Sequence, residues 1–226
     1  MALGGLLLVG AGCAKQADVA VTTKDNTPVT VTETSVTSPS AGATTEPTTT
    51  VIADGTYALA IDKSVVSWGG LRLDGDHRVG TLKLAEGSVT AAGGQLTAGT
   101  FTIDMNSLAE SGHNAGVEKH LKSDDFFGVG KYPTAVFTLT KPVEIDESGS
   151  GTVTGNLQLH GMTKEISFPA LVKVVGGELT AVANFNLDRT LWNVKYGSGK
   201  FFKSLGNKLI KDDMEVGLRL FAAVKK

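Results

Sequence analysis

The four histidines are the residues best suited to chemistry near neutral pH, because imidazole has an unperturbed pKa close to that range. They are His77, His113, His120 and His160. No two of them have the H-x-x-x-H spacing of a helical zinc site, and the chain has one cysteine and no G-x-S-x-G nucleophile motif. His113 and His120 would share a helical face only if one helix covered both, and Asn114 is the better helix start. We therefore expect no metal site, no cofactor and no enzymatic activity.

The single cysteine, Cys13, follows an uncharged and largely apolar stretch that ends in Gly10, Ala11 and Gly12. An apolar core followed by small residues is typical of a secretory signal, although the usual basic start is absent. The residues directly before Cys13 resemble the lipobox of bacterial lipoproteins, in which the cysteine becomes the lipidated N-terminus. We expect residues 1–12 to be an export signal and Cys13 to carry a lipid anchor. An ordinary signal peptide with an incidental cysteine is the alternative.

The stretch after Cys13 changes character abruptly. Residues 14–50 are dense in Thr and Ser, contain three prolines and have no aromatic residue. Such a composition cannot build a core, and a coil of this length spans on the order of 35 Å. We assign residues 13–52 to the lipidated cysteine and a disordered tether, and residues 53–226 to one folded domain. The expected location is the periplasm or cell envelope, at a membrane.

Charge and hydropathy exclude other partners. The 226 residues include 21 Lys and Arg against 23 Asp and Glu, so the chain has no excess of basic residues with which to bind nucleic acid. No apolar run approaches the roughly 20 residues of a membrane-spanning helix, so we expect attachment through the anchor alone. The 28 glycines and few prolines favour a turn-rich β protein.

The folded part alternates apolar and polar residues with the period of half-buried strands. Residues 100–105 show this most clearly, with Phe101, Ile103 and Met105 on one face, and the strand is expected to end at Asn106-Ser107. One short helix is expected over residues 114–121. Long consecutive antiparallel strands fit a sandwich or, better, an up-and-down barrel of about eight strands with a ligand-sized interior. The other expected strands are residues 57–61, 65–73, 79–89, 134–140, 151–160, 165–175, 178–188 and 215–224.

Four segments resemble the YceI-like family of bacterial exported proteins. The most specific is KHLKSDDFFGVGKYPTAVF at residues 119–137; the others are SVVSWGG (64–70), VTGNLQLHGMTK (153–164) and DRTLWNV (188–194). This sequence departs from the family pattern at Gly128, where an acidic residue is commoner, and at Asn193, where glycine is commoner. The resemblance implies a lipocalin-like antiparallel barrel that binds a polyisoprenoid, an isoprenoid quinone or a similar long amphiphilic lipid, without catalysis.

Candidate ligand-binding residues follow from this resemblance and from the alternation of the strands. For the apolar strand residues, plain core packing is the competing interpretation, because the sequence does not show which face lines a cavity. The candidate walls are Trp68, Leu82, Phe101, Ile103, Phe137, Leu157, Phe168 and Phe185.

Two further groups are expected at a barrel end. His120, Asp124 and Asp125, with the adjacent Phe126 and Phe127, are interpreted as a cap with Phe126 packing inside, or as a structural plug.

Arg189 is expected either to bind a polar head group or to pair with a carboxylate, and the structural role, pairing with a carboxylate, is preferred.

Apolar residues of the last strand permit a homodimer, but barrel closure is the simpler use for them. The alternative function is a structural or interaction lipoprotein with a filled barrel and no ligand.

Overall fold

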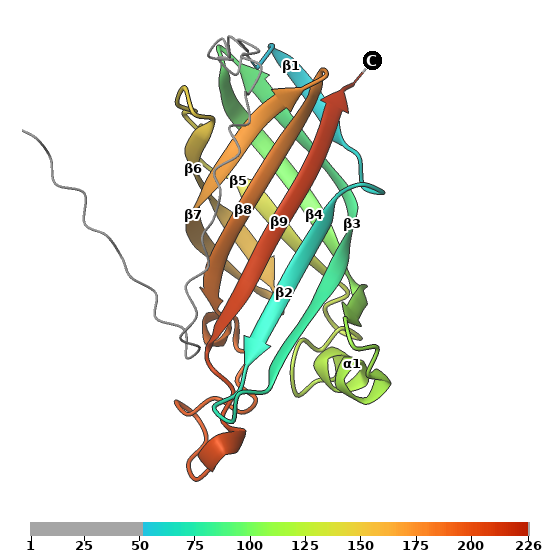
Figure 1. Cartoon of the computed structure of the whole chain (residues 1–226), viewed down its shortest axis with the longest axis vertical. Helices are drawn as coiled ribbons and strands as arrows, with labels where there is room; N and C mark the ends of the chain where they lie inside the picture. Colours follow the sequence, from blue (N-terminus) through green and yellow to red (C-terminus); the bar gives the residue numbers. More distant parts are fainter. Residues whose placement is uncertain (1–51, 226) are drawn as a thin grey trace, which may run out of the picture. The chain divides into compact units, whose positions relative to one another are not determined.

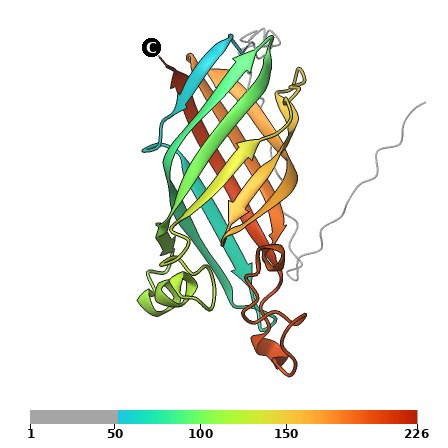
Figure 2. The ribbon, with the colours of Figure 1, turned by 180° about the vertical axis from the view of Figure 1, so that it is seen from behind.

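A computed structural model describes residues 52–225 and shows a closed antiparallel β-barrel with one short helix (Figures 1 and 2). The predicted fold class is thereby confirmed. The described strands are β1 Gly55–Leu59, β2 Val65–Leu71, β3 His77–Ala92, β4 Gln95–Glu110, β5 Thr134–Leu139, β6 Ser150–Leu159, β7 Met162–Val175, β8 Glu178–Asp188 and β9 Asp213–Val224.

The barrel has eight strand positions because β1 and β2 share one. Both pair with β3 on one side and with β9 on the other, and they are separated by residues 60–64. The remaining neighbours follow chain order from β3 to β9, and every pairing is antiparallel. The last strand is therefore hydrogen-bonded along both edges, which closes the barrel.

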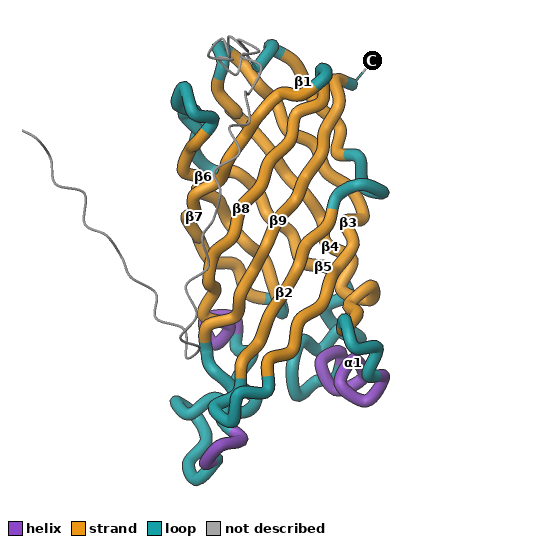
Figure 3. The backbone as a smooth tube through the Cα atoms, in the orientation of Figure 1, coloured by secondary structure: helices purple, strands orange, loops and turns teal. Residues whose placement is uncertain are grey.

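The two ends of the barrel differ. Short Gly-Gly turns at residues 93–94 and 176–177 lie at one end, together with a buried cluster that includes Tyr57, Val143 and Ala222. The Tyr57 hydroxyl donates to the Ala53 carbonyl over 2.8 Å, and Val143 and Leu96 exchange backbone hydrogen bonds. We call this the closed end. The long loops between β4 and β5 and between β8 and β9 lie at the other end, the mouth (Figure 3).

The helix at the mouth, α1 Ala115–Lys122, begins where the sequence predicts it. The Asn114 side chain caps it by accepting from the amides of Gly116 and Val117. The buried Glu110 carboxylate accepts from the Asn114 amide over 3.1 Å, and the Glu110 amide donates to Glu118 over 2.9 Å. These bonds fix α1 against the end of β4.

The expected end of the fourth strand at Asn106-Ser107 is wrong, because β4 continues to Glu110. The pairing register of β3 and β4 shifts between Thr81 and Lys83. There the Ser107 hydroxyl accepts from the Lys83 amide over 2.7 Å and donates to the Asp104 carbonyl. A side chain thus replaces a backbone partner, and the turn-forming pair sits in a bulge within a continuing strand.

The two residues that depart from the YceI-like sequence pattern, Gly128 and Asn193, both have left-handed backbone conformations. Gly128 has φ 54°, and Asn193, which ends the 3₁₀ helix η1 Arg189–Trp192, has φ 63°. Asparagine tolerates this conformation better than most residues, so the turn forms without the glycine that is commoner there.

Candidate functional site: an apolar channel with a polar mouth

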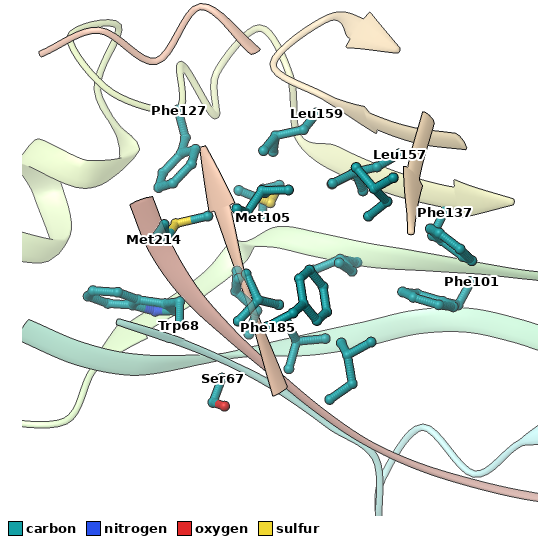
Figure 4. Close-up of a pocket in the computed structure, with 18 of the residues that line it drawn as sticks. Ser67, Trp68, Phe101, Met105, Phe127, Phe137, Leu157, Leu159, Phe185 and Met214 are labelled. Atoms are coloured by element: carbon teal, nitrogen blue, oxygen red, sulfur yellow. The ribbon is translucent and has the colours of Figure 1, made fainter. Parts of the chain in front are cut away.

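A cavity of about 70 Å³ lies inside the barrel towards the mouth. Its walls come from most of the strands, and the labelled side chains Trp68, Met105, Leu159 and Phe185 converge on the same space (Figure 4). Ser67 is the one polar residue of the lining, and it is an exposed position of β2. This cavity therefore offers a ligand hydrocarbon contacts and almost no hydrogen-bonding groups.

A second cavity, of about 90 Å³, lies between the first cavity and the closed end. Phe101, Phe137 and Phe168 line both cavities and so form the partition between them. The rings of Phe101 and Phe137 stack with centroids 5.2 Å apart, and Phe168 stacks on Phe185 at 4.3 Å. A ligand tail that passes the mouth-side cavity must displace this aromatic partition.

A larger pocket of about 430 Å³ lies at the mouth, beneath α1 and the β8–β9 loop. Trp68, Phe127 and Met214 line both this mouth pocket and the mouth-side cavity. These three side chains therefore form the neck through which the polar mouth reaches the apolar interior.

The arginines of the mouth pocket are already paired with carboxylates. Arg72 contacts Asp74 at 2.6 Å and Asp76 at 3.4 Å, and Arg78 contacts Asp76 at 2.8 Å and Glu110 at 3.6 Å. The Asp76 contact is also the main cause of the raised pKa of Arg78. The charges of these two arginines are thus compensated, whereas Lys211, which also lines the pocket, has no carboxylate within 4.0 Å among residues 52–225.

Four buried nitrogens of residues lining the same pocket lack a partner with hydrogen-bond geometry among the described residues: Nε1 of Trp68, Nε of Arg72, Nε of Arg78 and Nε2 of His120. Trp68 is 8% exposed. The His120 ring packs edge-on against Tyr196, with centroids 4.5 Å apart. Because a buried unpaired N–H group is costly, a group that accepts a hydrogen bond would be stabilised beside Trp68.

Arg189 organises the β8–β9 loop. It is 3% exposed, and its guanidinium donates to the carbonyls of Val194 over 2.8 Å, Ile210 over 3.2 Å and Lys211 over 3.2 Å. Burial lowers the pKa of Arg189, although Asp212 at 3.9 Å opposes this effect. The residue borders the mouth pocket, but its donors are committed to the protein's own backbone.

Asp188 and Lys200 hold the base of the same loop, and we expect this pair to make stability depend on pH. Burial alone would raise the pKa of Asp188, but hydrogen bonds from Lys200, at 2.8 Å, and from Thr190 lower it below its ordinary value. A lowered pKa contributes stability that is present above about pH 4 and is lost as pH falls through the folded-state value. Lys200→Met should therefore raise the Asp188 pKa and reduce the melting temperature only above about pH 4.

Carboxyl NMR titration and melting curves between acid and neutral pH check this expectation. Lys203→Met is the matched control, because Lys203 is exposed and has no carboxylate within 4.0 Å among residues 52–225. Equal losses of stability at all pH values for Lys200→Met would contradict the assignment.

The structure brings the sequence-predicted residues together at two levels of the channel. Phe126 and Arg189 border the mouth pocket. Phe127, rather than the expected Phe126, reaches the barrel cavity, while both rings are buried. Asp124 and Asp125 are exposed, and Asp124 pairs with Lys131 at 2.7 Å. All eight predicted wall residues line the mouth-side cavity: Trp68, Leu82, Phe101, Ile103, Phe137, Leu157, Phe168 and Phe185.

Sequence reasoning missed Met214 of the neck and Tyr196 of the mouth pocket. Met214 precedes Val216 and Leu218 in the same alternation, so starting the strand two residues earlier would have found it. Tyr196 lies in a loop whose fold no local pattern indicates.

Neither a metal-binding cluster nor a membrane-spanning helix is found among residues 52–225. Within residues 52–225, no three His, Cys, Asp or Glu side chains gather where they could hold a metal ion. None of the helices in this range has the length and apolar character needed to cross a membrane. The predictions for Cys13, the export signal and the tether concern residues outside this range, apart from Ile52, the last residue of the expected tether, which is buried in the closed-end cluster.

Comparison with known proteins places the barrel in a family. The model of the YceI-like domain matches residues 57–222. The chain belongs to the YceI-like family. A UPF0312 protein of Pseudomonas putida strain W619 is 35% identical over 91 residues, which are 40% of this chain and 47% of the relative. A UPF0312 protein of Vibrio vulnificus strain YJ016 is 38% identical over 84 residues, 32% of this chain and 44% of the relative. The chain spans about half the length of the curated relatives it matches.

Solved structures share the YceI-like barrel. Burkholderia cenocepacia BcnA superposes with a TM-score of 0.62 at 21% identity, covering 73% of this chain and 99% of BcnA. A polyisoprenoid binding domain from Saccharophagus degradans, implicated in plant cell wall breakdown, superposes with a TM-score of 0.59 at 17% identity, covering 75% and 98%. At these identities the likeness concerns the fold.

Proposed function

We propose that this YceI-like chain is an exported, non-enzymatic binding protein that sequesters or carries a long apolar ligand, such as a polyisoprenoid or an isoprenoid quinone. The main support for this proposal is the pair of apolar cavities, whose linings contain no ionisable side chain. An apolar tail gains about 25 cal/mol for each Å² removed from water, without any catalytic group. The fold shared with a domain named as polyisoprenoid-binding supports this ligand class.

The mouth pocket receives the polar head of the ligand in this proposal. Asp74, Asp76 and Glu110 compensate the charges of Arg72 and Arg78, and Trp68 Nε1 is an unsatisfied donor among the described residues. This chemistry favours a group that accepts a hydrogen bond, such as a quinone carbonyl or a hydroxyl. Lipidation at Cys13 would hold the protein at a membrane, and Cys13→Ser should then release it into the soluble fraction at high salt, which screens charge-dependent contacts with lipid.

Solvent extraction of the protein purified from a bacterial host, followed by mass spectrometry, tests the ligand class. We expect one isoprenoid lipid per barrel, and a bare barrel after candidate lipids have been offered would overturn the proposal. The alternative function is a structural lipoprotein without a ligand. The small cavity volumes favour it, because side chains already fill most of the barrel.

Intrinsic fluorescence offers a site-specific prediction, because the chain has two tryptophans in different environments. Trp68 lines the neck, while Trp192 is fully buried and donates from Nε1 to the Leu157 carbonyl over 3.0 Å. Titration with an isoprenoid quinone should quench Trp68 strongly and leave Trp192 nearly unchanged. Trp68→Phe should therefore remove most of the ligand-dependent signal, and a signal that survives this substitution would place the ligand elsewhere.

A further inference from the structure

The β8–β9 loop has a charge that contrasts with the rest of the chain. The loop, residues 189–212, contains six basic residues and one acidic residue, Asp212, whereas the rest of the chain has 15 basic against 22 acidic residues. Within residues 52–225, Lys203, Lys208 and Lys211 have no carboxylate within 4.0 Å. The loop therefore presents uncompensated positive charge at the mouth of an otherwise acidic protein.

The same loop exposes two adjacent aromatic side chains. Phe201 is 48% exposed and Phe202 is 47% exposed, and the Lys195 ammonium lies 4.7 Å from the centroid of the Phe201 ring. Leu73, from the neighbouring β2–β3 loop, is 55% exposed, and its amide donates to the Leu209 carbonyl over 2.9 Å. Large apolar side chains among lysines form the pattern of segments that lie in the interface of a bilayer.

The exposure of these rings is built into the fold. Ser198 is fully buried, and its carbonyl accepts from the amides of Phe201, at 3.2 Å, and Phe202, at 3.0 Å. The Ile210 amide donates to the Gly197 carbonyl over 2.8 Å. The 3₁₀ turn η2 Gly206–Lys208 forms the tip of the loop, which projects beyond the barrel at the mouth (Figures 1 and 3).

We propose that the tip of the β8–β9 loop docks on an anionic lipid surface, with Phe201 and Phe202 entering the interface and Lys203, Lys208 and Lys211 contacting lipid phosphates. Each lysine charge near such a surface strengthens binding about five-fold at low salt. Because Tyr196, Ile210 and Lys211 also line the mouth pocket, docking would bring the mouth itself to the membrane. This surface stands apart from the proposed ligand, since it does not depend on what the cavities hold.

A tryptophan placed at the tip tests the proposal directly. The full chain with Cys13→Ser, which prevents lipidation, would carry Phe202→Trp or, as the matched reporter at the closed end, Val175→Trp; Val175 is 65% exposed. The probes are vesicles of phosphatidylcholine alone and vesicles in which roughly a third of the lipid is phosphatidylglycerol. We expect a blue shift, and quenching by brominated acyl chains, for the tip reporter with anionic vesicles only.

Charge-reversal variants provide a second test of the proposed membrane contact. Lys203→Glu with Lys208→Glu should weaken binding to anionic vesicles by at least about ten-fold, whereas Lys173→Glu near the closed end should change it little. The melting temperature of each variant reports whether the fold is intact. Unchanged binding after the double reversal, equal responses of the two reporters, or a tip reporter silent with both vesicles would overturn the proposal. The last result would be expected if an acidic protein surface, rather than a membrane, covered the tip.

Discussion

Replacing Arg189 with methionine should lower the free energy of unfolding by about 3–5 kcal/mol. The substitution leaves the carbonyls of Val194, Ile210 and Lys211 without the donors that they have in the native loop. Burial of unsatisfied carbonyls is costly, and one buried guanidinium serves all three. For a domain of this size the expected fall in melting temperature is roughly 10 °C. Thermal unfolding measures this change, and amide hydrogen exchange should show the loss of protection first in the β8–β9 loop.

The Arg189→Lys variant distinguishes the contribution of the guanidinium N–H donors from that of the positive charge. A lysine keeps the positive charge near Asp212, but its single ammonium cannot reach three carbonyls on different sides. We expect it to recover less than half of the lost stability. A lysine variant as stable as the native protein would show that charge alone matters, and the assignment of Arg189 to the backbone would be wrong.

Replacing Met214 with glutamate should weaken binding of an apolar-tailed ligand by at least about 100-fold. Met214 lies at the neck, where it borders both the mouth pocket and the mouth-side cavity. A carboxylate there must lose water when a hydrocarbon tail fills the neck, which costs several kcal/mol, and each 1.4 kcal/mol corresponds to about ten-fold in affinity. Titration with an isoprenoid quinone, which has no carboxyl group to titrate, measures the effect at neutral pH.

The pH dependence of this variant provides an internal check. An apolar surrounding raises the pKa of a buried carboxyl group, so the new side chain should become neutral as pH falls, and binding should recover. Met214→Leu is the isosteric control and should bind nearly as well as the native protein. Full binding by the glutamate variant at neutral pH would mean that the ligand tail does not pass this neck.

The barrel was predictable because strand alternation is a local property of the sequence. The inward residues Phe101 and Ile103 follow from period two alone, and Asn114 marks the helix start by its capping chemistry. The extent of β4 was not predictable in the same way. Ser107 continues the strand only because its hydroxyl meets the Lys83 amide of a neighbouring strand, and that contact depends on the register of the folded sheet.

The mouth depends still more on tertiary contacts. The order of Phe126 and Phe127 is set by the turn after α1, where backbone bonds from residues 126–129 return to the helix end. The role of Arg189 depends on carbonyls up to 22 residues away along the chain. The sequence could nominate these residues as important, but their partners are defined only when the β8–β9 loop has folded.

The seam of the barrel also affects how the protein can fold. Strand β9 pairs with β1 and β2, so the last strand of the domain joins the first two. A chain emerging with its N-terminus first cannot close the barrel until residues 213–224 have been made. Folding that waits for such distant pairings is slow, and a sheet without β9 has two open edges, one on β8 and one formed by β1 and β2, that can recruit other chains. Truncation before Asp213 should therefore yield aggregates rather than a smaller barrel, because closure by the last strand commits the whole domain to its fold.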